Sequence, residues 1–148
     1  MIRSLPGARL AQVTAVAEMA TGGWMLLVNG ARPEQHGLDP TQVMVRMRIP
    51  ADAVAVNDRD VVATLGPLTG AVDKAGTVGW FCITTRDGEP VMDGTVGLSR
   101  ELDSADTLLV PDDGALVPRA FDILLNRVQL LRGDTVTVEV VAIKARER

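Results

Sequence analysis

Few residues of this chain have the types and spacing that chemistry requires. The chain of 148 residues has one histidine, His36, in a loop rich in Gly and Pro, and one cysteine, Cys82, between Phe81 and Ile83. A histidine-based triad or a zinc site needs partner residues that this inventory lacks. A thiol inside an apolar run is a poor nucleophile, because burial disfavours the thiolate. We therefore expect Cys82 to be a small buried hydrophobe and His36 to be a solvated loop residue.

The acidic stretch PDDG, at residues 111–114, is a candidate calcium site. Asp112 and Asp113 could supply oxygen ligands, but the stretch lacks the alternating ligands and the distal Glu of an EF-hand loop. A turn explains both residues without an ion. The stretch GPLTG, at 66–70, lacks the Lys-Ser/Thr ending of a phosphate-binding loop. We assign no catalytic, cofactor-binding or metal-binding residue, expect no cofactor, and predict that the protein is not an enzyme.

Two Asp-Gly pairs in the stretch GTVGWFCITTRDGEPVMDGTVGL, residues 76–98, have a structural explanation. Asp87 and Gly88 lie between two β-prone runs, where Asp-Gly accepts the positive φ of a tight hairpin turn. Asp93 and Gly94 lie inside the returning run, which predicts a bulge or bend at that point. We therefore interpret all four residues as structural.

Composition and charge argue against several classes of function. The net charge is −4, the aromatic content is 3%, and the basic residues cluster only in the tail IKARER. Nucleic-acid binders usually carry a basic face, and single-stranded nucleic acids and sugars are bound on aromatic rings. The N-terminus lacks the apolar core of a signal peptide, and no run reaches the roughly 18 apolar residues of a membrane helix. We expect no nucleic-acid partner, no membrane, and a reducing cytoplasm.

The elements that must position these residues are one helix and about eight strands. Apolar residues at helical spacing between Ser4 and Gly22 predict a helix over about residues 6–21. The predicted strands cover residues 24–28, 43–49, 61–68, 78–85, 90–98, 107–110, 121–131 and 134–143, with turns at 71–77 and at the RGD of 132–134. This pattern predicts one domain, residues 1–148, that is all-β: an antiparallel β-sandwich over about 24–143 with a short N-terminal α-helix.

Three stretches resemble a family of small tailed-phage virion proteins. The first, ARLAQVTAVAEMATGGWMLLVNGARPE, is similar to the family's opening helix, strand and G-x-R-P loop. The second, AGTVGWFCITTRDGEPVMDGTVG, resembles its central motif, in which a strand and turn precede VMDG-x-VG. The third, FDILLNRVQLLRGDTVTVEVVAI, is similar to its C-terminal strand pair. The chain departs from the family at Cys82, where the family has Arg, and in about twenty additional residues, 99–120.

The resemblance implies a virion component. Its implied architecture is that of the jelly-roll cement proteins of short-tailed phages, which sit on the capsid exterior and clamp neighbouring subunits of the major capsid protein. The implied partners are the major capsid protein or other virion subunits, with assembly in the cytoplasm of the bacterial host, and we expect a homo-oligomer, either a dimer or a trimer. The resemblance carries over no catalytic or binding residue.

Other functions stay open at this point. A tail, head–tail or fibre-base component fits the same resemblance, and copy number in the particle separates it from a decoration protein. A carbohydrate-binding or host-surface module belongs to a different class, and the scarcity of aromatic residues disfavours it.

The acidic excursion over residues 99–120 carries the candidate partner interface. Its apolar residues exceed what a solvated loop needs; they are Leu108, Leu109, Val110, Leu116, Val117 and Phe121. One hypothesis is that they contact a neighbouring virion subunit, with the acids around them meeting basic groups there. The alternative, of equal weight, is that they cover the protein's own sandwich.

Overall fold

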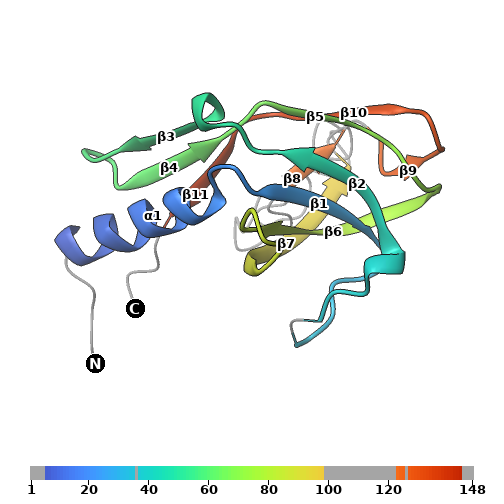
Figure 1. The fold of residues 1–148 in the computed structure, drawn as a ribbon, viewed down its shortest axis with the longest axis horizontal. Helices are drawn as coiled ribbons and strands as arrows, with labels where there is room; N and C mark the ends of the chain where they lie inside the picture. The colour runs from blue at the N-terminus through green and yellow to red at the C-terminus, as the bar shows by residue number, and fades with distance from the viewer. Residues whose placement is uncertain (1–5, 36, 99–122, 126, 145–148) are drawn as a thin grey trace, which may run out of the picture.

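The computed structural model describes residues 6–35, 37–98, 123–125 and 127–144. In these residues the chain forms mostly antiparallel β-sheets and a single short α-helix (Figure 1). The predicted fold class, all-β with one N-terminal helix, is confirmed, and the arrangement is compatible with a β-sandwich. The jelly-roll-like order of connections stays a prediction.

Three sheets contain the described strands. The largest has the spatial order β2 (Val43–Arg48), β1 (Trp24–Asn29), β6 (Gly76–Thr84), β7 (Pro90–Leu98), β8 (Ile123–Leu125), and β9 (Gln129–Leu130) pairs with β6. The second pairs β10 (Thr135–Val138) with β5 (Leu68–Ala71). The third has the order β11 (Val141–Lys144), β4 (Val62–Leu65), β3 (Val54–Asn57). Two short 3₁₀ helices, η1 (Pro40–Gln42) and η2 (Ala51–Ala53), precede β2 and β3.

The main core lies between the large sheet and the pair formed by β5 and β10, which Figure 1 shows running along one side of β2 and β1. Met25 and Leu27 of β1 and Phe81 and Ile83 of β6 are buried in this core, together with Val138 of β10. Burial of such a side chain stabilises the fold by roughly 1.5–3 kcal/mol. This packing holds the large sheet in place and so positions the residues on its outer face.

Helix α1 (Pro6–Ala20) contributes one apolar stripe to the same core. Val13, Ala17 and Ala20, spaced by four and three residues, are buried, and the helix lies against β3 and β4. Gly22 ends the helix with a φ of 79°, a conformation that glycine adopts without strain. The predicted helix over residues 6–21 is confirmed to within one residue.

Strand β1 is apolar along nearly its whole length because both of its faces are covered. Leu26 and Val28 point away from the main core and form a second buried cluster with Val43, Trp80 and Cys82. A strand that is buried on both faces has no polar face to alternate with, which explains the continuous run WMLLV. The outer face of the large sheet is therefore partly apolar.

Three predicted strands are divided in the structure. Gly66, with a φ of 112°, and Pro67, which has no N–H group, separate β4 from β5 within the predicted strand 61–68. The predicted strand 121–131 comprises β8 and β9, and the predicted strand 134–143 comprises β10 and β11. Strand β3 was missed, because three of its four residues are exposed and no apolar periodicity marks it.

The bulge predicted at Asp93 and Gly94 is wrong. The pairing of β6 with β7 is regular through both residues, and the register shift lies instead between Ile83 and Thr84. Gly94 is also not one of the described glycines with a positive φ. Both residues belong to the body of β7, so a turn does not explain them.

Strands β7 and β8 run parallel, which departs from the predicted antiparallel sandwich. Val96 pairs with Ile123, and Leu98 pairs with Leu125. Adjacent parallel strands need a crossover connection of a dozen residues or more. Residues 99–122 join these two strands, so the parallel pairing gives a backbone reason for a long connection at this point.

Candidate functional site

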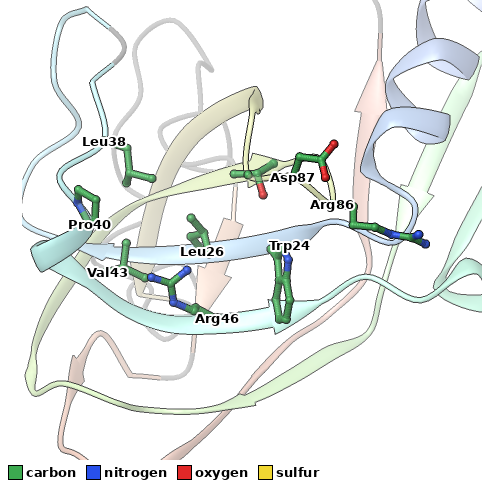
Figure 2. Close-up of a pocket in the computed structure, with 10 residues that line it drawn as sticks. Trp24, Leu26, Leu38, Pro40, Val43, Arg46, Arg86 and Asp87 are labelled. Atoms are coloured by element: carbon green, nitrogen blue, oxygen red, sulfur yellow. The ribbon is translucent and has the colours of Figure 1, made fainter.

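The outer face of the large sheet carries a groove of about 340 Å³. Figure 2 shows its floor on β1 and β2, with one wall on the loop before β2 and the other on the turn between β6 and β7. The lining residues are Trp24, Leu26, Leu38, Pro40, Val43, Arg46, Thr84, Arg86, Asp87 and Gly88. Most of the floor is apolar, and the charged residues lie around it.

The register of the strands sets the composition of the floor. Leu26 of β1 pairs with Arg46 of β2 on one side and with Cys82 of β6 on the other. Trp24 pairs in the same way with Arg48 of β2. Directly paired residues project to the same face of a sheet, so Trp24 and Leu26 each have an arginine of β2 beside them on the outer face.

The loop over residues 30–42, of which residue 36 is not described, forms the first wall through Leu38 and Pro40. Arg32 of the loop makes an ion pair with Asp93 of β7, with 2.5 Å between Nη2 and Oδ1. Leu38 contacts the second apolar cluster. Gly79 permits this approach, because a Cβ atom there would lie 1.8 Å from the carbonyl oxygen of Gly30. Asp93 therefore fixes the loop across the sheet.

Hydrogen bonds at the end of the loop hold its shape. Asn29 Nδ2 donates to Gln42 Oε1 at 2.9 Å. The hydroxyl and the backbone N–H of Thr41 both donate to Asp39 Oδ1, at 2.7 and 2.9 Å. These bonds, the hydroxyl first, hold the pKa of Asp39 below its ordinary value. The wall is thus formed before any partner arrives.

The turn between β6 and β7 forms the second wall. Thr85 N–H donates to the carbonyl of Glu89 at 2.8 Å, and Gly88 N–H donates to the carbonyl of Thr85 at 3.0 Å. Gly88 has a φ of 90°, which a β-branched residue tolerates poorly. The structure places Asp87 and Gly88 at this reversal, where the sequence predicted a hairpin turn.

The groove is basic although the chain is acidic. Its lining has two arginines, Arg46 and Arg86, against one carboxylate, Asp87. Figure 2 shows Arg86 directed away from the floor, towards Gly22 at the end of the helix, so Arg46 is the arginine that lies at the floor itself. Arg48 lies over the Trp24 ring, with 5.4 Å between the guanidinium carbon and the ring centroid, a cation–π distance. The chain as a whole carries a net charge of −4. The local excess of positive charge therefore favours a partner with negative charge.

Cys82 lies in the second apolar cluster, paired with Leu26 of the groove floor. Its side chain is fully buried, and its Sγ lies 3.8 Å from the carbonyl oxygen of Ile83. Burial, and secondly the negative charge of Asp93, raise the pKa of the thiol to about 11. The thiol is therefore protonated at neutral pH and acts as a small hydrophobe, as the sequence indicated.

Several predicted residues lie outside the described part of the chain. These are the candidate interface residues Leu108, Leu109, Val110, Leu116, Val117 and Phe121, the acids Asp112 and Asp113, the strand predicted over 107–110, and His36. Within the described ranges, no group of three or more His, Cys, Asp or Glu residues could hold a metal ion. No helix in those ranges is long and apolar enough to span a membrane.

Sequence reasoning missed the groove itself. In the stretch VMVRMRI, residues 43–49, Arg46 and Arg48 alternate with apolar residues, and the stretch WMLLV, residues 24–28, contains Trp24 and Leu26. The signal that joins these residues is the pairing of β1 with β2, which no local pattern reveals.

Comparison with protein-family models, with curated protein sequences and with solved structures finds no match to this chain. The resemblance to a phage virion family therefore stays a prediction from the sequence motifs.

Proposed function

We propose that this protein is a non-enzymatic structural subunit of a phage virion, and specifically a decoration protein that binds the capsid exterior and stabilises contacts between major capsid protein subunits. The motif resemblance supplies the class of particle. The observation that carries the proposal is the groove. Its apolar floor has Arg46 at the edge and lies between two walls whose shape is held by hydrogen bonds.

A preformed groove suits a protein that must add contacts to an existing shell. Because loop 30–42 is fixed by the Arg32–Asp93 ion pair and by hydrogen bonds, binding orders few additional groups. A smaller ordering cost leaves more of the contact energy as affinity. Many copies on one particle then act together, so each single contact can be modest.

A tail, head–tail or fibre-base component is the alternative that the resemblance also allows. Each of those structures needs few copies in one particle, whereas decoration of a shell needs many. Quantitative mass spectrometry of purified particles, with heavy-isotope standards for this chain and for the major capsid protein, measures the ratio directly. A decoration protein should approach the copy number of the capsid subunit. A ratio of a few per cent would support the tail alternative, and absence from the particle would overturn the proposal.

A further inference from the structure

The groove has the size of a site for side chains of a partner. A dry apolar cavity of about 150 Å³ holds one benzene molecule, so a groove of about 340 Å³ has room for roughly two groups of that size. Small-molecule sites usually enclose most of their ligand. This groove lies open on a sheet face between a loop and a turn, so it suits side chains of a larger molecule that continues beyond it (Figure 2).

The charged residues that line the groove indicate which chemical groups the partner should carry. Figure 2 shows the Arg46 side chain extending over Val43 at the edge of the floor. Among the described residues the ion pairs are Arg32–Asp93 and Arg127–Asp134, so they include neither Arg46 nor Arg86. A guanidinium presents a rigid fork of N–H donors that matches a carboxylate. Arg46, at the edge of the floor, can therefore bind an acidic side chain of the partner.

We infer that the groove binds an extended segment of a partner protein in which one or two large apolar side chains lie next to an Asp or Glu. The apolar side chains would cover Trp24 and Leu26, and the carboxylate would meet Arg46. This inference rests on the proposed function for the identity of the partner, a neighbouring virion subunit, and on the groove alone for the chemistry of the segment.

Selection from a random twelve-residue peptide library displayed on an unrelated scaffold tests the chemistry. The immobilised full chain is the bait, and the enriched peptides are synthesised and titrated at low salt. Tryptophan fluorescence reports binding, since Trp24 lines the groove and Trp80 lies in the apolar cluster beneath it. We expect enriched peptides to combine large apolar residues with Asp or Glu. We also expect the substitution Arg46→Glu to weaken their binding at least tenfold, and 0.5 M NaCl to reduce that difference.

Arg59→Glu is the matched control, because Arg59 is also exposed and lies in the turn between β3 and β4, outside the groove lining. It makes the same change in net charge and should alter binding less than twofold. Equal losses in the two variants, enriched peptides without carboxylates, or no enrichment over the empty support would each overturn the inference. The copy number in the particle does not depend on this result, so the proposed function and the groove specificity can fail separately.

Discussion

The buried thiol of Cys82 makes stability depend on pH in a way that the structure specifies. The ordinary pKa of a cysteine thiol is taken as 9.0 for the unfolded chain, and burial, with the nearby Asp93, raises the pKa of Cys82 to about 11 in the folded protein. Between these values the unfolded chain loses the proton while the folded protein keeps it. Stability is therefore fully present below pH 9 and falls as the pH rises towards 11.

The expected size follows from the difference between the two pKa values. Each pH unit in that window is worth about 1.4 kcal/mol. At pH 10 the thiol should lower the free energy of unfolding by about 1 kcal/mol relative to pH 8. Lysines and other groups also titrate in this range. The pH-dependent loss of stability must therefore be compared with that of a variant that lacks only the thiol.

Urea unfolding of the native chain and of Cys82→Ala, followed by Trp fluorescence at pH 8, 9 and 10 under reducing conditions, isolates this contribution. At pH 8 Cys82→Ala should be less stable than the native chain, because it leaves a small cavity among Leu26, Val43 and Trp80. The native chain should then lose about 1 kcal/mol more than the variant on going from pH 8 to 10. Parallel losses in the two proteins would refute the burial of the thiol.

Three further predictions concern the framework of the groove. In a double-mutant cycle of Arg32→Ala and Asp93→Asn, urea unfolding should give a coupling energy of about 1 kcal/mol for this ion pair, because the Asp93 side chain is only 12% exposed. A coupling energy near zero would show that other contacts hold the loop. Gly23→Ala should lower the free energy of unfolding by about 2 kcal/mol or more, because its Cβ atom would lie 2.0 Å from a carbonyl oxygen of β6. The control variant Gly7→Ala should be neutral or stabilising, because the space around Gly7 is open. Equal effects of the two substitutions would contradict this packing. Gly88→Val should lower the melting temperature through a cost of about 1–2 kcal/mol at its φ of 90°, and an unchanged melting temperature would argue against the turn.

The local parts of the fold were predictable from the sequence. The helix has apolar residues at helical spacing and is followed by Gly22, and the run WMLLV has the length and composition of a buried strand. The hairpin turn at Asp87 and Gly88 also follows from local backbone chemistry. In these cases the structure is determined by residues that are close together in the chain.

The non-local features were not predictable in the same way. Asp93 was interpreted as part of a bulge because it precedes a glycine, whereas its carboxylate binds Arg32, about sixty positions earlier. The parallel pairing of β7 with β8 depends on a connection whose direction no periodicity encodes. The groove likewise requires the register that sets Leu26 beside Arg46. Each of these three features depends on contacts between segments that are distant in the chain, and local sequence patterns do not predict such contacts.

The most direct test of the central claim is the binding of purified protein to capsids assembled without it. Capsids are incubated with increasing amounts of the native chain or of Arg46→Glu, separated from free protein by sedimentation, and the bound copies are counted against the major capsid protein. The account predicts saturable binding of the native chain at a fixed, high ratio to capsid subunits, with at least tenfold weaker binding of Arg46→Glu and little change for Arg59→Glu. Failure of the native chain to bind these capsids at any concentration would contradict a decoration function.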